Sequence, residues 1–286
     1  MCCVVHLTSS PMIWTTTRFD IDLSRPQVMG IVNVTPDSFS DGGQSATTAL
    51  AMKHCESLLR DGADLLDIGG ESTRPGSSPL SLSEELERVL PVVGSAISLG
   101  VPISVDTYKP EVMRAVLDLG ADVINDIWAL RQGDAQDVVA SHARCGVCLM
   151  HMHRDPQTMQ VVPMVGDVLV PVADFLRDRV NALTALRVDT TRIVLDPGIG
   201  FGKTVEQNFV LLARQRELLV LGFPLMAGWS RKSSLGVVTG RADPAQRVAA
   251  SVAAAVLAVE RGARVVRVHD VAATADALRV WQAVQL

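Results

Sequence analysis

The sequence predicts a single α/β domain folded as a (β/α)8 TIM barrel. Eight short apolar runs alternate with helical stretches, and each run ends in a polar or charged side chain. The length of 286 residues suits one such barrel, which typically needs about 250 residues. Because the carboxyl ends of all eight strands meet at one rim, these polar endings are expected to surround a single mouth. They are Asn33, Glu71, Asp106, Asn125 with Asp126, His151, Asp196, Ser230 with Arg231 and Lys232, and Arg267 with His269 and Asp270.

A short hairpin is predicted before the first barrel strand. Residues 13–25 alternate apolar with polar side chains and stop before Pro26, which indicates a small antiparallel pair closing the bottom of the barrel. Residues 1–13 are expected to form a flexible lead-in, and residues 14–286 the barrel domain. Residues 28–32 are almost all apolar, as expected for a strand buried on both faces, and a helix is expected over 46–60.

Seven further strand–helix units follow in the same order. The predicted pairs are 65–68 with 82–99, 103–105 with 110–119, 123–124 with 135–143, 147–150 with 168–185, 193–195 with 205–219, 225–227 with 244–261, and 265–268 with 272–283. Pro110 and Pro244 suit the first turns of their helices. A doubly wound open sheet is the alternative, but its glycine-rich dinucleotide fingerprint is missing after the first strand. The barrel is therefore favoured.

Composition narrows the class of protein. The net charge of −5 makes nucleic acid an improbable partner. Five scattered cysteines do not suggest a disulfide framework, and the Cys145–Cys148 pair lacks a second ligand pair at zinc-site spacing. No run of about 18 apolar residues is present to span a membrane. These features predict a cytoplasmic protein, and Cys145 and Cys148 are expected to be buried, inert thiols.

Two long polar loops follow the first two predicted strands. Residues 33–43 end in two glycines, and residues 69–76 contain glycines around one arginine. Ordinary surface turns would explain either loop alone. Two such loops on the rim of one barrel are better explained as lids that fold over a ligand.

Three strand ends carry hydrogen-bonding groups that suit a flat heterocycle. Asp106, Asn125 and Asp196 end the third, fourth and sixth predicted strands. Two carboxylates and an amide match a ring system that presents an exocyclic NH2 and ring N–H donors. The alternative is that each side chain caps the helix that follows it, which Asp does well.

Positive charge is concentrated at the last two strands. Lys232 follows the seventh strand, and Arg267 and His269 lie two residues apart on the eighth, hence on one face. A phosphate or diphosphate at this point fits the usual anion site of TIM barrels. The alternative is a salt bridge from Arg267 to Asp270 or to another carboxylate at the rim.

Two motifs resemble ligand sites without meeting their requirements. Residues 196–204 end in Gly-Lys-Thr, but Pro197 stands where a P-loop needs glycine. His151 and His153 have the spacing of a metal pair; barrel hydrolases carry such a pair on the first strand, whereas this one ends the fifth. Neither motif is assigned a ligand.

The motifs at the strand ends resemble those of the dihydropteroate synthase family over residues 14–286. They are MGIVNVTPDSFSDGG (29–43), DIGGESTRPG (67–76), ISVDT (103–107), IND (124–126), LMHM (149–152), LDPGIGFGK (195–203), SRKS (230–233) and RVHDV (267–271). The resemblance implies a transferase that condenses 6-hydroxymethyl-7,8-dihydropterin diphosphate with p-aminobenzoate to give 7,8-dihydropteroate and diphosphate. It also implies Mg2+ as cofactor and a homodimer formed through the last two helices.

The same resemblance implies a role for individual residues. Asp41, Asp106, Asp196 and Lys232 would be catalytic, with Asp41 facing the reacting carbon. The pterin would be held by Asp106, Asn125, Met150, Asp196 and Lys232. The diphosphate would be held by Arg267 and His269, and Mg2+ by Asn33. The p-aminobenzoate pocket would comprise Phe39, Thr73, Pro75, Phe201 and Ser233.

Three aromatic residues depart from the family pattern without touching these positions. They are Tyr108, Trp128 and Trp229; Trp229 either narrows the mouth or packs behind the seventh strand, and packing is expected. Two other functions remain open at this point. A related barrel could transfer a methyl group from a methylated folate, although that reaction gives no reason for the two long loops or for the Arg267–His269 anion site. A non-catalytic pterin binder is the second.

Overall fold

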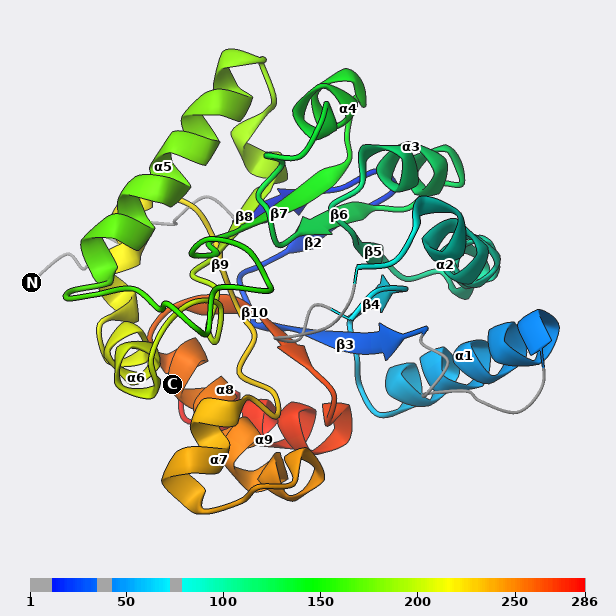
Figure 1. The fold of residues 1–286 in the computed structure, drawn as a ribbon. Coiled ribbons are helices and arrows are strands. Elements are labelled where there is room, and N and C mark those ends of the chain that lie inside the picture. Colours follow the sequence, from blue (N-terminus) through cyan, green and yellow to red (C-terminus); the bar gives the residue numbers. More distant parts are fainter. Residues whose placement is uncertain (1–11, 35–42, 73–78, 286) are drawn as a thin grey trace, which may run out of the picture.

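The computed structural model describes residues 12–34, 43–72 and 79–285 and shows a closed parallel barrel ringed by helices (Figure 1). Neighbouring strands follow the order β10-β3-β4-β5-β6-β7-β8-β9 around the barrel. Their bounds are β3 Gln27–Asn33, β4 Leu65–Gly69, β5 Ile103–Asp106, β6 Val123–Asp126, β7 Gly146–Met150, β8 Ile193–Asp196, β9 Leu225–Ala227 and β10 Ala263–Val268. The predicted TIM barrel is confirmed, and the open-sheet alternative is wrong.

The helices cover the outside of the barrel, as Figure 1 shows. They are α1 Gly43–Arg60, α2 Leu82–Ala96, α3 Pro110–Asp118, α4 Ala135–Ser141, α5 Leu169–Ala185, α6 Val205–Ala213, α7 Ser233–Thr239, α8 Val248–Glu260 and α9 Val271–Ala283. Short 3-10 helices follow α2 (η2 Ile97–Leu99) and α6 (η4 Gln215–Leu221) and precede β8 (η3 Thr190–Arg192) and α8 (η5 Pro244–Arg247). The helix predicted over 205–219 is therefore an α-helix that continues as a 3-10 helix.

Among the described α-helices, α7 is the one that the sequence pattern did not predict. It has seven residues, contains Gly236 and two valines, and ends at Gly240 in the left-handed conformation (φ +68°). Such a segment has weak helix propensity. Tertiary packing stabilises it instead, because a side chain at Gly236 would come within 2.6 Å of the Arg241 carbonyl oxygen and Arg247 Nε.

An antiparallel hairpin closes the amino end of the barrel, as predicted. Strands β1 (Ile13–Thr15) and β2 (Asp20–Asp22) pair with each other, so the hairpin lies within the predicted range 13–25. Trp14 is fully buried and donates from Nε1 to the Arg192 carbonyl oxygen at 2.9 Å. The hairpin packs into a layer inside the barrel made of Trp14, Ile21, Leu23, Met29, Leu65, Val123, Cys148, Val194, Met226 and Val265.

A buried ion pair anchors the hairpin to the barrel wall. Asp122, which is fully buried before β6, accepts hydrogen bonds from the backbone N–H, Nε and Nη2 of Arg18 at 2.9, 3.2 and 2.6 Å. Its Oδ2 also accepts from the Ile103 N–H at 2.8 Å, at the start of β5. The carboxylate thus joins the hairpin to two barrel strands while all its bonds remain internal.

On four strands the inward face changes from apolar to polar within two residues. Side chains two positions apart on a strand share a face, so Leu65 is followed inside by Asp67, Val123 by Asn125, Val194 by Asp196, and Val265 by Arg267. The first member of each pair belongs to the apolar layer at the hairpin. The second members form a polar layer nearer the carboxyl ends of the strands, where the candidate site lies.

The outer face of the strands packs against the helices in one large apolar core. Cys145 and Cys148 are buried free thiols in the described structure, and burial raises the pKa of each. The expectation of buried thiols is confirmed for this pair; Cys2 and Cys3 lie outside the described residues. Among helices of the described ranges, none is long and apolar enough to cross a bilayer.

Candidate active site

Three predicted residues meet in the polar layer. Asp106 ends β5, Asn125 lies in β6 and Asp196 ends β8, and all three are buried. None caps the helix after it: Lys109 precedes α3, Asp134 precedes α4, and Thr204 caps α6 through its own side chain. The helix-capping alternative is therefore wrong for these residues. Asp196 instead accepts a hydrogen bond from the Gly198 N–H at 2.7 Å.

Arg267 spans the polar layer and joins it to β4 and β5. Its Nε donates to Asp67 Oδ2 at 2.6 Å, and its Nη2 donates to Asp106 Oδ2 at 2.8 Å. Arg267 therefore forms the salt bridge to another carboxylate that was predicted as an alternative. The predicted pairing of Arg267 with Asp270 is wrong. Asp270 pairs with Arg231 at 2.6 Å instead. Burial opposes ionisation of Arg267, but the two carboxylates outweigh it and raise the pKa, so the guanidinium remains charged.

Two carboxyl groups of the site, those of Asp106 and Asp196, resist ionisation because they are buried. Burial raises the pKa of Asp106 to about 7, although Arg267 acts to lower it. Burial also raises the pKa of Asp196, against the opposing effects of the Gly198 N–H and Lys232. A ligand that donates N–H groups or carries developing positive charge would favour the ionised form of both. Such a site is electrostatically suited to an electron-poor heterocycle.

Lys232 and Phe201 lie in contact although they follow different strands. The Lys232 Nζ lies 4.4 Å from the centre of the Phe201 ring, within the range of a cation–π interaction. Phe201 is buried in the loop after β8, and Ser233 is exposed at the first position of α7. The structure therefore brings one predicted pterin residue beside one predicted p-aminobenzoate residue.

His269 is held beside the end of β9. Its backbone N–H donates to Ser230 Oγ at 3.0 Å, and its Nδ1 lies 3.0 Å from the same oxygen. The Ser230 hydroxyl thus fixes both the backbone and the imidazole ring of His269. The Nε2 atom takes no part in the contact with Ser230.

Met150 and Asn33 lie at the mouth on opposite sides of the polar layer. Met150 ends β7 and is buried in a small cluster with Ile127, Met152, Met159 and Phe201. This cluster gives the mouth an apolar wall. Asn33 ends β3 in register with Gly69 of β4 and is partly exposed. Phe39, Asp41, Thr73 and Pro75 lie outside the described residues.

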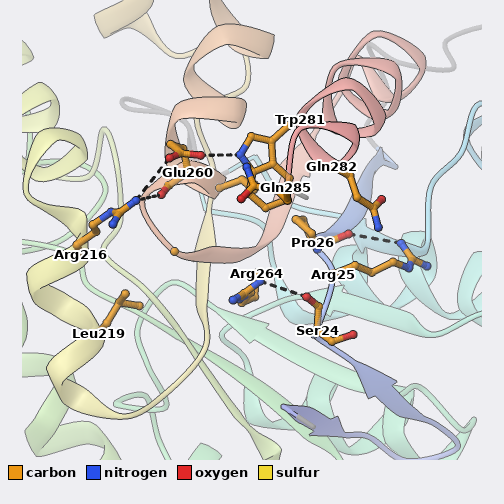
Figure 2. A pocket seen from close by; sticks show the side chains of 12 residues that line it. Ser24, Arg25, Pro26, Arg216, Leu219, Glu260, Arg264, Trp281, Gln282 and Gln285 are labelled. Carbon is orange, nitrogen blue, oxygen red and sulfur yellow. Dashed lines mark hydrogen bonds and ion pairs between the residues drawn. The ribbon is translucent and has the colours of Figure 1, made fainter. Parts of the chain in front are cut away.

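The structure also contains a cavity at the amino end of the barrel, away from the polar layer. Its volume is about 510 Å3, and Figure 2 shows Arg216, Glu260 and Trp281 connected across one side. Pro26, Gly262 and Arg264 place it at the amino ends of β3 and β10. No predicted site residue lines this cavity, so size alone would misplace the active site.

Comparison with known proteins decides the family. Residues 29–269 match the family model described as pterin binding enzyme. The chain is 51% identical to the dihydropteroate synthase of Neisseria meningitidis serogroup B, over 95% of this chain and 97% of that protein. The chain belongs to the dihydropteroate synthase family.

Solved structures of dihydropteroate synthases share the fold closely. The enzyme of Xanthomonas albilineans with 4-aminobenzoic acid has a TM-score of 0.91 and 52% identity, covering 96% of this chain and 99% of that one. The enzyme of Burkholderia cenocepacia complexed with 7,8-dihydropteroate has a TM-score of 0.88 and 50% identity, covering 97% and 98%. The family resemblance stated from the motifs is confirmed.

Two buried residues of this dihydropteroate synthase barrel were missed as site residues. Asp67 lies inside β4 and is fully buried, and Lys203 lies after β8 and is 2% exposed. Asp67 could have been found from the period of two, because it shares the inward face of Leu65 within a short apolar strand. Lys203 carried no comparable signal, since it lies in an irregular loop.

Lys203 holds the loop after β8 against the end of β7. Its Nζ lies 2.9 Å from His151 Nδ1, 2.8 Å from the Gly198 carbonyl oxygen and 3.2 Å from the Phe201 carbonyl oxygen. The loop lies so close to the end of β7 that a Cβ at Gly198 would be 1.8 Å from the His151 carbonyl oxygen. The ammonium group therefore sets the position of the backbone that carries Phe201. His151 is thus a hydrogen-bond partner of Lys203. The described residues contain no group of three or more His, Cys, Asp or Glu that could hold a metal.

This contact predicts a distinctive pH dependence of stability. Burial and Lys203 lower the pKa of His151 to about 2, whereas an unfolded histidine takes up its proton near 6.5. Below that pH the unfolded chain binds one more proton, so His151 should lower the free energy of unfolding by up to about 1.4 kcal/mol per pH unit. Urea unfolding of the wild type and His151→Gln between pH 6.5 and 4.5 measures the effect.

The glutamine keeps an acceptor for Lys203 but takes up no proton. The wild type should lose stability relative to His151→Gln as the pH falls. Parallel stability curves for the two proteins would contradict the assignment.

The three aromatic departures from the family pattern lie apart from the polar layer. Trp229 is 1% exposed and packs in the outer apolar core, as expected, but its ring partner at 5.3 Å is Phe209 on α6 and not the helix after the seventh strand. Tyr108 and Trp128 line a rim cavity of about 240 Å3 together with Glu71. The Tyr108 hydroxyl donates to Glu71 Oε1 at 2.9 Å, which ties the base of the second loop to the end of β5.

Proposed function

We propose that the polar layer of this barrel binds 6-hydroxymethyl-7,8-dihydropterin diphosphate and condenses it with p-aminobenzoate, giving 7,8-dihydropteroate and diphosphate. The observation that supports this most is the meeting of Asp106, Asn125, Asp196 and Arg267 inside one mouth of a dihydropteroate synthase barrel. The ligands of two relatives are consistent with it, because one solved enzyme holds 4-aminobenzoic acid and another holds 7,8-dihydropteroate.

The pterin ring would lie on the polar layer. Asp106, Asn125 and Asp196 would accept its N–H hydrogens, and Lys232 would donate to a ring acceptor. Met150 would pack against one face of the ring, since it forms the apolar wall beside this layer. A buried donor left without a partner costs about 1–3 kcal/mol, so these groups discriminate strongly for the correct ring.

The diphosphate would lie nearer the rim, beside the carboxyl end of β10. Arg267 keeps its charge at all pH values of interest, because Asp67 and Asp106 raise its pKa despite burial. His269 is fixed by Ser230 and would add a second donor. Together they would neutralise the charge that develops as the diphosphate leaves.

Asn33 suits the Mg2+ that the family implies. Mg2+ in phosphate-transfer sites typically takes one or two protein oxygens and completes its shell with substrate phosphates and water. Asn33 offers one amide oxygen at the rim, where it lies in register with Gly69 of β4. When bound, the metal would supply further neutralisation of the leaving diphosphate.

The p-aminobenzoate would enter from the rim. Phe201 and Ser233 would line its pocket, and Phe39, Thr73 and Pro75 would complete it from the two loops. The contact between Phe201 and Lys232 places this pocket directly against the pterin site. Asp41 would face the incoming amine. Closure of the loops would exclude water, which competes with a weakly nucleophilic arylamine.

The charges favour a dissociative substitution. The bond between the exocyclic carbon and the diphosphate oxygen would break first, and the pterin ring would share the resulting positive charge. Asp106 and Asp196 would favour this cation in their ionised forms, which burial disfavours and a nearby positive charge would stabilise. The amine would then add to the carbon and lose one proton, without a covalent enzyme intermediate.

Release of diphosphate tests the proposed reaction. Purified protein given pterin diphosphate, p-aminobenzoate and Mg2+ should release one diphosphate per dihydropteroate formed, and EDTA should stop release. Asn33→Ala should raise the Mg2+ concentration needed for half-maximal rate, whereas Asn181→Ala, on the exposed face of α5, should not.

The alternatives make different predictions in the same assay. Pterin binding without diphosphate release would identify a non-catalytic binder. Methyl transfer from a methylated folate, with no requirement for p-aminobenzoate, would identify the second alternative.

We also propose that the protein is a homodimer formed through α8 and α9. Both helices expose large apolar side chains, with Leu257 43% and Val280 68% exposed, and the adjacent α7 exposes Val237 and Val238. Burying such a surface against a second copy would be favourable. Sedimentation equilibrium should therefore give twice the chain mass of 30.6 kDa. The cytoplasmic location stays a prediction.

A further inference from the structure

One buried carboxylate in the barrel is assigned no contact with either proposed substrate. Asp67 is fully buried in β4, yet it contacts side chains from three other strands. Its Oδ1 accepts from Ser104 Oγ of β5 at 2.6 Å. Its Oδ2 accepts from Asn125 Nδ2 of β6 at 3.2 Å and from Arg267 Nε of β10 at 2.6 Å. Two of these partners are proposed substrate ligands.

We propose that Asp67 is a positioning residue that fixes the orientation of the Asn125 amide, and thereby makes the pterin site select a ring N–H donor at that position. This inference rests on the proposed function. It adds the origin of the specificity, which the contacts of the ligand residues alone do not explain.

The orientation follows from the hydrogen-bonding capacity of the groups. An amide side chain offers a donor at one end and an acceptor at the other, and rotation by 180° exchanges them. An ionised carboxylate only accepts. With Asn125 reversed, its oxygen would lie at the 3.2 Å position beside Asp67 Oδ2, and two acceptors would face each other. Asn125 Nδ2 is therefore committed to Asp67, and Oδ1 is left for the ligand.

The described part of the chain leaves Oδ1 available for this purpose. Among the described residues, the Asn125 side chain forms its hydrogen bond with Asp67, and 4% of the Asn125 surface stays exposed. Asp106, which lies beside Asn125 in the register of β5 and β6, also presents acceptor oxygens. The floor of the site is thus lined with acceptors, and a ligand must bring the hydrogens.

Asp67 also fixes the plane of Arg267. The Nε and Nη2 atoms of the guanidinium are both occupied, one by Asp67 and the other by Asp106. Two bonds to two strands prevent rotation of the planar group. The same carboxylate therefore orients one group proposed for the ring and one proposed for the diphosphate.

Asp67→Asn tests the inference while keeping the shape of the side chain. The probes are 6-hydroxymethyl-7,8-dihydropterin and derivatives in which one ring N–H at a time is replaced by a carbon group, with binding measured by calorimetry. The wild type should bind one derivative about 10- to 100-fold more weakly than the parent, because an acceptor is left unpaired. In Asp67→Asn the Asn125 amide can turn, so this penalty should shrink to less than about threefold.

Two further variants separate positioning from a general loss of structure. Ser104→Ala removes the third bond to Asp67 but leaves its contacts with Asn125 and Arg267, so the wild-type ranking of derivatives should persist. The exchange Asp67→Asn with Asn125→Asp places an obligatory acceptor at 125 and should restore the penalty. This double variant also keeps the net charge of the layer.

The outcomes are distinct. Weaker binding of every probe by the same factor in Asp67→Asn, with unchanged ranking, would overturn the inference and leave Asp67 a structural residue. Loss of ranking in Ser104→Ala, or failure of the exchange variant to restore it when both fold by circular dichroism, would also overturn it. A wild-type protein that binds no pterin would instead refute the proposed function.

Discussion

Arg267→Met is expected to abolish turnover and to destabilise the barrel at the same time. The substitution leaves Asp67 and Asp106 in a buried layer without their shared counter-charge. Breaking a buried ion pair in this way costs about 3–5 kcal/mol, and the lower end applies because the Arg267 side chain is 22% exposed. The loss of a preorganised charge at the leaving group should lower kcat by about 100- to 1,000-fold.

Both effects can be measured and separated. Urea unfolding gives the stability, and diphosphate release under saturating substrates gives kcat. Adding Asp106→Asn to Arg267→Met should recover part of the stability, because one buried charge is removed, without recovering kcat. Arg267→Lys should fall between wild type and Met, since an ammonium group cannot reach both carboxylates as a planar fork does. Full activity in Arg267→Met would refute the proposed anion site.

Trp14→Ala is expected to give the largest loss of stability without a loss of chemistry. Trp14 is fully buried in the layer that fills the amino end of the barrel. Removing a buried tryptophan side chain typically costs about 3–5 kcal/mol, because apolar contacts are lost and a cavity remains. Thermal and urea unfolding should show this decrease. At temperatures where the variant stays folded, kcat/KM should equal that of the wild type.

A conservative substitution divides the effect into two parts. Trp14→Phe keeps most of the apolar volume but loses the hydrogen bond to the Arg192 carbonyl oxygen, and should cost less, about 1–3 kcal/mol for the acceptor left unpaired. Equal destabilisation by Ala and Phe would mean that the hydrogen bond matters more than the filling of the barrel. A change in kcat/KM with unchanged folding would mean that the hairpin acts on the mouth.

The strand pattern was readable because each barrel strand is short and buried on both faces. Runs such as Val28–Val32 and Ile193–Leu195 are continuous apolar segments that end in Asn33 and Asp196. The spacing of these endings is enough to place them on one rim once the fold is a barrel. Helix α7 escaped detection because its seven residues have neither a long apolar stripe nor strong propensity, and contact with Arg247 holds it.

The contacts inside the mouth were less accessible from the sequence. Arg267 was expected to face an anion or a rim carboxylate, but its partner Asp67 lies 200 residues away in the middle of another strand. Lys203 was set aside with a failed nucleotide motif, although it holds the loop of Phe201 through three contacts. Such pairs depend on the stagger of strands around the barrel, which no local pattern encodes.

From the chain alone came the barrel, the hairpin at its base, the polar residues at its rim and the family, because periodicity and motifs are local properties. Which carboxylate meets Arg267, which way the Asn125 amide turns, and what Lys203 holds were decided by tertiary structure. Hydrogen bonds between side chains have a range of about 3 Å, so only the closed barrel, which brings distant strands to that separation, determines them.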